Sequence, residues 1–403
     1  MDVVRGELRT VDDGGGEESL ASLIERSAEL KRALVDFACG PRFERHLAPF
    51  MLEAAGPEGE LSEGEAIGII DRFALQHRLP NGKTVLDQFT TSRPDLTPAD
   101  REILRGWHDP VEGIFEIHGK DRDAITLLNL IDDLEYRTYS NVGPAAFARL
   151  PQGGFAHARL VPIRPLPSVW LVSGTVAGYP KSSAAQIAEV ALELATRRPE
   201  LVYRNPERIE QGWKQMRRDR AAFMEFFGSD EVVLPPAEAG ERLNAYYRHR
   251  QEAALAAHPG HRRPRNVPGM DIPAFDLPAE LADAGTIGII YDETDGLNFY
   301  NEYGMLRDLF ADPVLAADNR HSQVLRGYLR ADSIGPLPLR RLAAAFPQTT
   351  DTVFRRILRK PNFTWAEHGE ALLRRRKPWY YEQEPRPGTS VIGARLTELV
   401  SRR

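Results

Sequence analysis

The stretch from Val111 to Pro180 most constrains the fold, because it contains five strand-like segments in succession with helical sequence on either side. Apolar and polar residues alternate within the segments, and turn-forming residues separate them. The predicted strands span residues 113–118, 124–130, 134–140, 155–161 and 168–176. A meander of this kind exposes unpaired edges unless it closes on itself. We therefore predict a small five-stranded β-barrel of OB type, with an SH3-like barrel as a nearly equal alternative.

The remaining sequence is mostly helical in pattern, so the predicted fold class is α+β: a largely helical chain around a small barrel. We predict a disordered acidic tail at 1–18, a helical and hairpin region at 19–110, the barrel at 111–180, a helical segment at 181–257, a proline-rich linker at 258–278 and a basic C-terminal domain at 279–403. In the second of these regions, Ala66–Phe73 and Thr84–Phe89 are predicted as strands joined across Pro80-Asn81-Gly82.

A short motif recurs at a distance. Ile67-Gly68-Ile69-Ile70 is repeated as Ile287-Gly288-Ile289-Ile290. Asp87-Gln88-Phe89 has a partial counterpart in Asp308-Leu309-Phe310 at a nearly equal offset. Internal duplication and chance both account for two matches this short, and chance is the simpler explanation.

The charge of the chain is divided unevenly. Its formal net charge of −6 combines a tail from Arg320 onward, with 17 Lys and Arg against 7 Asp and Glu, and a body with 35 against 51. The tail therefore carries +10 and the body −16. Such a split predicts either a polyanionic partner for the tail or docking of the tail on the acidic body.

The basic tail provides the main candidate binding site. Three short helices are predicted within residues 337–376, and their proportions resemble a helix-turn-helix domain. Two successive helices carry cations that would contact phosphates, and aromatic residues that would stack or form a wing follow directly. These candidates are Arg355, Arg356, Arg359, Lys360, Arg374, Arg375, Arg376, Lys377, Trp379 and Tyr380. The alternative is that basic residues in a last helical turn simply stabilise the helix dipole.

The predicted barrel offers a second candidate surface. Aromatic and basic residues on its strands would form a stacking face for bases, comprising Tyr136, Tyr139, His157, Arg159 and Trp170. In a barrel of this size, however, about half of such aromatic residues fill the core. The sequence therefore favours the core interpretation over the stacking face.

No catalytic residue, metal site or cofactor is predicted. Gly82-Lys83-Thr84 ends like a phosphate-binding loop, but the glycine required five positions before Gly82 is replaced by His77. Cys39 is the single cysteine, so neither a disulfide framework nor a cysteine-based zinc site is expected within the chain. His249, His258 and His261 cluster, but the last two lie in the proline-rich linker without a carboxylate at helical spacing.

The composition favours a protein of the cytoplasm. Hydrophobic residues make up 42% of the chain and charged residues 27%, yet no run of 18 apolar residues occurs, so no membrane partner is expected. The acidic N-terminus lacks the features of a signal peptide. The single cysteine suits a reducing compartment.

Parts of the chain resemble a group of bacterial proteins of unknown activity. In that group a Gly-Lys-Thr hairpin precedes a helix and a small barrel with a late Ser-Gly-Thr; the matching residues here are Gly82-Lys83-Thr84 and Ser173-Gly174-Thr175. Some members end in a cysteine-rich SEC-C tail that binds metal. This chain has no such tail, so the resemblance implies no metal, no activity and no catalytic residue.

The leading functional hypothesis is a non-catalytic protein that associates with DNA or RNA, or acts in regulation, through its basic C-terminal domain. The alternative is a protein-interaction scaffold whose basic tail docks on the acidic body. An enzyme of unrecognised type comes third, because catalytic groups can come from distant loops without leaving a motif.

Overall fold

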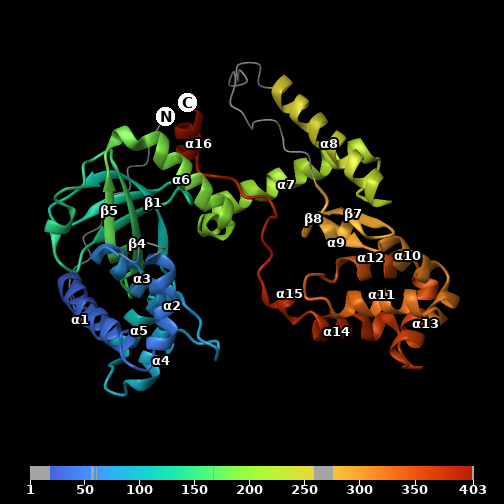
Figure 1. Cartoon of the computed structure of the whole chain (residues 1–403), viewed down its shortest axis with the longest axis horizontal. Coiled ribbons are helices and arrows are strands. Elements are labelled where there is room, and N and C mark those ends of the chain that lie inside the picture. Colours follow the sequence, from blue (N-terminus) through green and yellow to red (C-terminus); the bar gives the residue numbers. More distant parts are fainter. Residues whose placement is uncertain (1–18, 56–58, 60, 167, 258–275, 402–403) are drawn as a thin grey trace, which may run out of the picture. The chain divides into compact units, whose positions relative to one another are not determined.

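The computed structural model describes residues 19–55, 59, 61–166, 168–257 and 276–401. The predicted acidic tail and most of the predicted linker lie outside the described residues. The chain divides into two compact units: the first contains the residues up to Asn205 and from Ile392 onward, and the second runs from Pro206 to Val391 (Figure 1). The α+β class is confirmed, with 58% of the described residues helical.

The first unit places five helices before a five-stranded sheet and further helices after it. Its elements are α1 (Leu20–Ala38), α2 (Glu44–Ala55), α3 (Glu63–Gln76), α4 (Val85–Ser92), α5 (Pro98–Gly106), β1 (Val111–Lys120), β2 (Ile125–Asn129), β3 (Glu135–Tyr139), η1 (Pro144–Phe147), β4 (Phe155–Pro162), β5 (Val169–Tyr179), η2 (Lys181–Ser183), α6 (Ala184–Arg197), η3 (Pro199–Arg204) and α16 (Ala394–Ser401).

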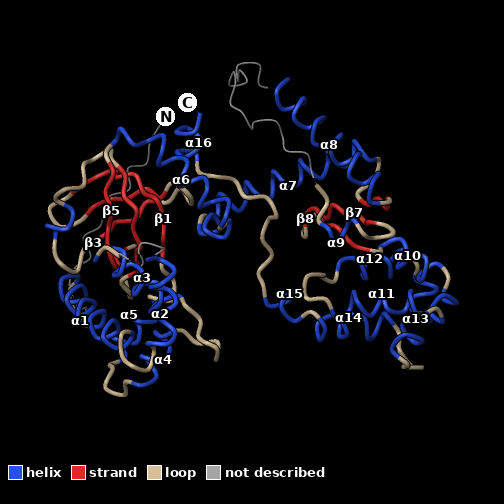
Figure 2. The backbone as a smooth tube through the Cα atoms, viewed as in Figure 1, coloured by secondary structure: helices blue, strands red, loops and turns tan. Residues whose placement is uncertain are grey.

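The five strands form one sheet that closes on itself, and Figure 2 shows them in red. Strand β1 pairs with β2 and β4, β2 with β3, and β4 with β5, all antiparallel. The ring is completed by parallel pairing of β3 with β5, in which Thr138 lies opposite Trp170. Every strand therefore has two neighbours, which removes the exposed edges that an open sheet would present. The prediction of five paired strands is confirmed.

The interior of the closed sheet follows the period-two pattern of the sequence. Phe115 and Ile117 of β1, Tyr136 of β3 and Ala156 and Ala158 of β4 are all buried in one apolar cluster. Trp170 packs against the same cluster, with its ring edge-on to Tyr136 at 4.9 Å. Small alanine side chains on β4 leave room for these large rings.

A layer of helices covers part of the sheet. Side chains from α1, α3, α4 and α5 share a buried cluster with Val161, Ile163 and Leu171, which come from β4, the segment after it and β5. Trp107, directly after α5, is fully buried there. The first unit therefore has one core inside the sheet and a second between the sheet and its helices.

A buried ion cluster joins the helical layer to the sheet. Asp71 of α3 is 2% exposed and forms ion pairs with Lys31 of α1 and with Arg159 of β4 at 2.8 Å. Ser173 of β5 donates to Asp71 at 2.8 Å and accepts from Lys31 at 2.7 Å. Although burial alone would raise the pKa of Asp71, the two cations hold it below its usual value. The carboxylate is thus charged and fully paired, as a buried charge must be.

The predicted strands at Ala66–Phe73 and Thr84–Phe89 are wrong, because both segments lie in helices. Helix α3 begins with a capping box between Ser62 and Glu65, and α4 with one between Thr84 and Asp87. Each box satisfies backbone amides that a strand would have to pair elsewhere. The turn at Pro80-Asn81-Gly82 exists, with Gly82 at φ 77°, but it connects two helices rather than two strands.

The second unit contains a small sheet between two groups of helices. Its elements are α7 (Pro206–Phe227), β6 (Glu231–Leu234), α8 (Pro236–Ala257), α9 (Ala279–Ala282), β7 (Ile287–Asp292), β8 (Gly296–Asn301), α10 (Tyr303–Ala311), η4 (Pro313–Ala317), α11 (Asn319–Arg330), α12 (Leu337–Ala345), α13 (Pro347–Leu358), α14 (Trp365–Arg376) and α15 (Pro378–Glu382). The strands pair antiparallel in the order β6-β7-β8.

Strand β7 shows how this sheet is buried on both faces. Ile287, Ile289 and Tyr291 share a cluster with α7 and α8, whereas Ile290 belongs to the cluster of α10 to α14. Gly288 lies against the ring of Tyr303, where a Cβ atom would come within 2.5 Å of the ring. The three predicted tail helices are confirmed as α12, α13 and α14.

The C-terminal helix α16 returns to the first unit. Leu396 and Leu399 pack with Ile114 of β1 and with α6. Arg395 forms ion pairs with Glu116 of β1, with atom separations of 2.5 and 2.8 Å. The compact units therefore separate at Asn205/Pro206 and Val391/Ile392, whereas the sequence placed its main boundary in the linker.

Among the described residues, no helix combines the length and the apolar character needed to cross a membrane.

The ion cluster predicts a large difference between two arginines of the closed sheet. Arg159→Met should destabilise the first unit by about 3–5 kcal/mol, because it removes one of the two cations that compensate the buried carboxylate of Asp71. The matched control is Arg137→Met, whose exposed pair with Asp121 should contribute under about 1 kcal/mol. Urea unfolding of the full chain measures both. Equal losses of stability would contradict the proposed role of the cluster.

A second prediction concerns pH. Burial raises the pKa of Asp132 to about 6, although the hydroxyl of Tyr136 donates to it at 2.6 Å. Because the folded protein holds this proton more tightly than the unfolded chain does, the free energy of unfolding should fall as the pH rises from about 4 to about 6. The loss should reach up to roughly 3 kcal/mol. Asp132→Asn cannot titrate. The stability of the native protein minus that of the variant should therefore decrease over this range in urea unfolding, and a constant difference would refute the assignment.

Candidate functional site

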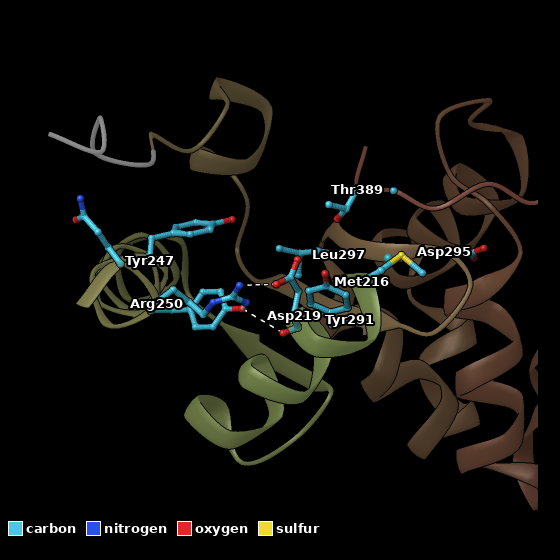
Figure 3. Close-up of a pocket in the computed structure, with 12 residues that line it drawn as sticks. Met216, Asp219, Tyr247, Arg250, Tyr291, Asp295, Leu297 and Thr389 are labelled. Atoms are coloured by element: carbon cyan, nitrogen blue, oxygen red, sulfur yellow. Dashed lines mark hydrogen bonds and ion pairs between the residues drawn. The ribbon is translucent and has the colours of Figure 1, made fainter. Parts of the chain in front are cut away.

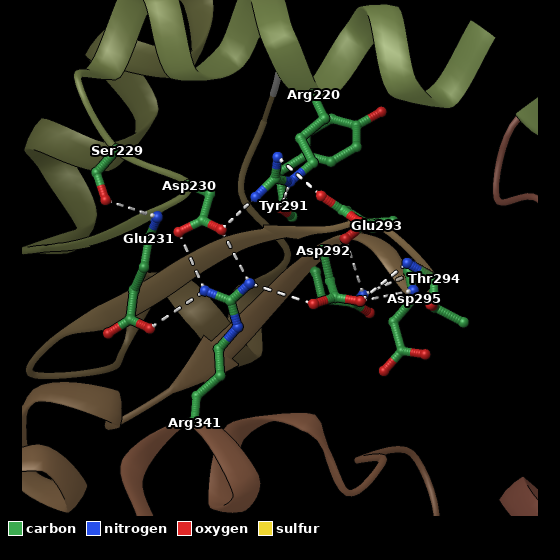
Figure 4. Close-up of polar contacts among 12 residues, drawn as sticks. Arg220, Ser229, Asp230, Glu231, Tyr291, Asp292, Glu293, Thr294, Asp295 and Arg341 are labelled. Carbon is green, nitrogen blue, oxygen red and sulfur yellow. Dashed lines mark hydrogen bonds and ion pairs between the residues drawn. The ribbon is translucent and has the colours of Figure 1, made fainter. Parts of the chain in front are cut away.

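A network of ion pairs organises the centre of the second unit (Figure 4). Arg341 of α12 donates to both carboxylate oxygens of Asp230 at 3.1 Å and to Asp292 at 3.2 Å. Arg220 of α7 donates to the same Asp230 at 2.6 Å and to the carbonyl of Tyr291 at 3.0 Å. The contact with Arg341 holds the pKa of Asp230 below its usual value. The two helical layers are thus tied to the sheet through one carboxylate.

The same network shapes the turn between β7 and β8. Asp292 accepts from the backbone amides of Thr294 at 2.9 Å and Asp295 at 3.3 Å. Burial would raise the pKa of Asp292, but these amides and Arg341 bring it below its usual value. Gly296 at φ 73° completes the turn. Asp295 therefore lies in a turn that is held in place by Asp292, which is itself ion-paired with Arg341.

Two pockets meet at this turn. The first, which we call the tyrosine pocket, has a volume of about 530 Å³ (Figure 3). Its lining consists of Met216, Asp219, Tyr246, Tyr247, Arg250, Gln251, Tyr291, Asp295, Gly296, Leu297, Gly388 and Thr389. Asp219 is ion-paired with Arg250, and the carboxyl group of Asp295 points away from the cavity in Figure 3. The tyrosine pocket therefore contains three tyrosines and a neutralised ion pair.

The second, which we call the tryptophan pocket, has a volume of about 640 Å³. Its lining consists of Thr294, Asp295, Asn298, Tyr300, Ser333, Gly335, Trp379, Tyr380, Glu382, Gln383, Glu384, Pro385 and Arg386. The hydroxyl of Tyr380 donates to Asp295 at 2.9 Å, and the rings of Trp379 and Tyr380 meet edge to face at 5.9 Å. Burial raises the pKa of Asp295. Aromatic rings and hydrogen-bonding groups thus line the same cavity, as in many ligand sites.

The basic residues predicted on α14 lie beside the tryptophan pocket. Arg374, Arg375 and Arg376 are exposed at the end of that helix. Arg374 is ion-paired with Glu370 at 3.5 Å and lies 4.3 Å from the ring centre of Tyr381. In the described part of the chain, no carboxylate pairs with Arg375 or Arg376, so both retain a free guanidinium group.

Lys377 does not belong to this exposed group. It is fully buried, and its ammonium group donates to the carbonyl of Ala331 at the end of α11. Burial lowers the pKa of Lys377. The lysine therefore joins the C-terminal ends of α11 and α14, where a cation is favoured by both helix dipoles.

The basic residues predicted on α13 lie at the other end of α14. Arg355 donates to the carbonyl of Phe363 at 2.7 Å and pairs with Asp351 at 3.2 Å, while Arg356 donates to the carbonyl of Pro313 at 2.6 Å. Arg359 and Lys360 are exposed, with no carboxylate partner in the described residues. Since α14 contains 12 residues, about 16 Å of helix separates this group from Arg374–Arg376.

The residues predicted as a stacking face of the closed sheet are not brought together. Tyr136 is 3% exposed inside the sheet, and Trp170 packs against it there. Tyr139 packs against the helical layer, Arg159 belongs to the buried ion cluster, and His157 is exposed. This placement agrees with the core interpretation that the sequence favoured for the aromatic residues.

Sequence reasoning found Trp379 and Tyr380 but missed Asp295, Asn298 and Tyr300. The local signal of the turn at 292–296 is an acidic stretch before a glycine, which favours a polar turn. Its position beside α15 depends on contacts between distant segments, which leave no local pattern. The described residues contain no group of three or more His, Cys, Asp or Glu arranged to hold a metal ion.

Comparison of the chain with protein-family models, curated proteins and solved structures gives no match.

The network predicts different consequences for two adjacent arginines. Arg341→Met should destabilise the second unit by roughly 2–3 kcal/mol, because Arg341 is only 22% exposed and its loss leaves two carboxylates short of a charged donor. Arg340→Met is the control: its pair with Glu370 is more exposed and should contribute at most about 1 kcal/mol. Chemical unfolding of each variant measures the difference. A smaller loss for Arg341→Met than for Arg340→Met would show that the network does not organise this unit.

Proposed function

We propose that this chain is a non-catalytic nucleic-acid-binding protein, and that the tryptophan pocket and the neighbouring end of α14 form its contact with a single strand. The supporting observation is that Trp379 and Tyr380 line a cavity of about 640 Å³ and follow three exposed arginines, with only the buried Lys377 and the exposed Pro378 between them. Aromatic rings beside a cationic strip are the combination that proteins use to bind single-stranded nucleic acid.

In this proposal the tryptophan pocket binds a base and the arginines bind phosphates of the backbone. Trp379, Tyr380 and Tyr300 supply aromatic surface for stacking. The carboxylate of Asp295 and the side-chain oxygen of Asn298 offer acceptors to base edges, while the Asn298 amide nitrogen is held by the carbonyls of Asp295 and Gly296. Arg375 and Arg376 supply free guanidinium groups for the backbone. The carboxylates of Glu382 and Glu384 would repel phosphates, so the backbone would run on the α14 side of the pocket.

A single strand fits this surface better than a duplex. Stacking within a pocket requires an unpaired base. A helix-turn-helix mode would lay α14 in the major groove, but that helix carries exposed Glu367 and Glu370 as well as its terminal arginines. These carboxylates would face the phosphates of the duplex.

We also propose that the closed sheet of the first unit is of OB type. The strand order β1-β2-β3-β5-β4, with β3 and β5 parallel, supports this assignment. The usual ligand surface of such a sheet lies on β2 and β3. Here Arg137 of β3 is already paired with Asp121 and donates to Tyr139, so the proposed contact lies in the second unit instead.

The competing function is a protein-interaction scaffold. The observation that favours it is α16, which docks within the first unit through Arg395 and Glu116. In this view the basic tail serves to hold its own chain together. A cytoplasmic role fits both functions, since the sequence contains a single cysteine.

The test is binding of a fluorescent single-stranded oligonucleotide to the full chain at about 50 mM salt, where phosphate contacts are strong. Trp379→Ala should weaken binding about 5- to 150-fold, corresponding to about 1–3 kcal/mol for one stacked base. Replacing Arg375 and Arg376 with alanine should flatten the salt dependence by about 0.7 for each phosphate that the protein no longer neutralises.

Arg307→Ala is the matched control, because Arg307 is exposed on α10 of the same unit. It should leave both the affinity and the salt dependence nearly unchanged. A full chain that binds no oligonucleotide at low salt would rule out the proposal and favour the scaffold. Unchanged oligonucleotide binding by Trp379→Ala would show that the tryptophan pocket is not part of the contact.

A further inference from the structure

The first unit contains a pocket lined by arginines, which we call the arginine pocket. It has a volume of about 260 Å³, and its lining consists of Phe50, Arg72, Phe73, Gln76, His77, Arg78 and Arg198. Arg72 lies on α3 and Arg78 follows that helix, whereas Arg198 follows α6, more than a hundred residues later. The fold therefore brings three guanidinium groups from separate segments to one cavity.

The carboxylates around this cavity are largely engaged by other cations. Glu112 of β1 is paired with Arg159 at 3.3 Å and with Arg198 at 3.4 Å. Arg198 also pairs with Glu200 at 3.1 Å. The pKa of Glu112 lies below its usual value because these arginines, and Arg72 nearby, outweigh the effect of burial. One carboxylate thus compensates several cations.

Arg72 and Arg78 are the least compensated cations of the pocket. In the described residues, neither forms an ion pair, and Arg78 donates only to the backbone carbonyl of Gly82 at 3.0 Å. Both side chains are exposed to solvent, so water weakens but does not abolish the repulsion between their like charges. A bound anion would relieve it, and arginine forks match the oxygen pairs of phosphate and carboxylate groups.

The rest of the lining limits the size and character of the anion. Phe50 and Phe73 form apolar walls, each in ring contact with His77 at 4.7 and 5.3 Å. Gln76 adds an amide donor. Burial, with a smaller effect of His46, lowers the pKa of His77, so its ring is neutral at neutral pH and offers one N–H donor. A small cavity lined by hydrogen-bond donors and two phenylalanine rings suits a compact ligand.

We propose that the arginine pocket binds the oxyanion group, phosphate or carboxylate, of a small metabolite. The contacts are made by Arg72, Arg78 and Arg198, with Gln76 as a further donor. Phe50 and Phe73 pack against the remainder of the ligand. This site is separate from the proposed nucleic-acid contact, because every residue that lines it belongs to the first unit.

The experiment uses the full chain and inorganic phosphate as the probe. Calorimetric titration at constant ionic strength should show saturable binding of phosphate over chloride. Arg72→Gln and Arg78→Gln should each weaken it at least about tenfold, since each removes a charge-assisted hydrogen bond. The matched control is Arg149→Gln, an exposed arginine of the same unit outside the pocket, and it should leave the affinity unchanged. Equal affinity in the pocket variants and the control would overturn the proposal.

Four further measurements separate the alternatives. Without phosphate, Arg72→Gln should keep or raise the melting temperature, because it relieves repulsion; a clear fall would assign Arg72 a structural role and overturn the proposal. Acetate titration establishes whether a carboxylate source competes with phosphate. Displacement of phosphate by a single-stranded oligonucleotide would instead make the pocket part of a nucleic-acid contact. Trp379→Ala should leave phosphate binding unchanged, so this test does not depend on the proposed function.

Discussion

An aspartate bridged by two cations from different layers, buried in the first unit and partly buried in the second, is the interaction on which both units depend. In the first unit, Asp71 joins Lys31 of the helical layer to Arg159 of the closed sheet. In the second, Asp230 joins Arg220 of α7 to Arg341 of α12 across the small sheet. Removing one cation leaves a charge in a poorly solvated place, so each bridge holds its layers in one arrangement. Apolar contacts alone would allow more than one packing arrangement of the layers. The bridges therefore make one arrangement more specific.

These bridges also change the meaning of the charge distribution. A tail with a net charge of +10 suggests a broad cationic surface, yet many of its cations are used internally. Arg341 organises the β7–β8 turn, Lys377 joins two helix ends, and Arg395 holds α16 to β1. Among the described residues, the cations without a carboxylate partner include a small set at the ends of α13 and α14. In the proposed function these few cations act together with an aromatic pocket, and charge alone is not the recognition element.

Much of the architecture was predictable, and the failures have a common cause. The five strands of the closed sheet and the tail helices α12 to α14 follow from local periodicity and turn residues. The hairpin predicted at 66–89 failed because β-branched and aromatic residues there suggested strands, while the capping boxes at Ser62 and Thr84 select helices. Ile-Gly-Ile-Ile shows the limit most clearly. The same four residues form part of α3 at 67–70 and part of β7 at 287–290, so duplication of one structural element does not explain the repeat.

By itself the sequence determined the fold class, the five strands of the closed sheet, and the neighbourhood of cations and aromatic residues at 374–380. These properties depend on residues close together in the chain, whose periodicity and turns act locally. Only the tertiary structure decided that Lys377 is buried, that Asp295 and Tyr380 meet, and that Arg72 and Arg198 share a pocket. Such pairings depend on which distant surfaces pack together. The sequence around a charged side chain does not indicate which residue will be its partner.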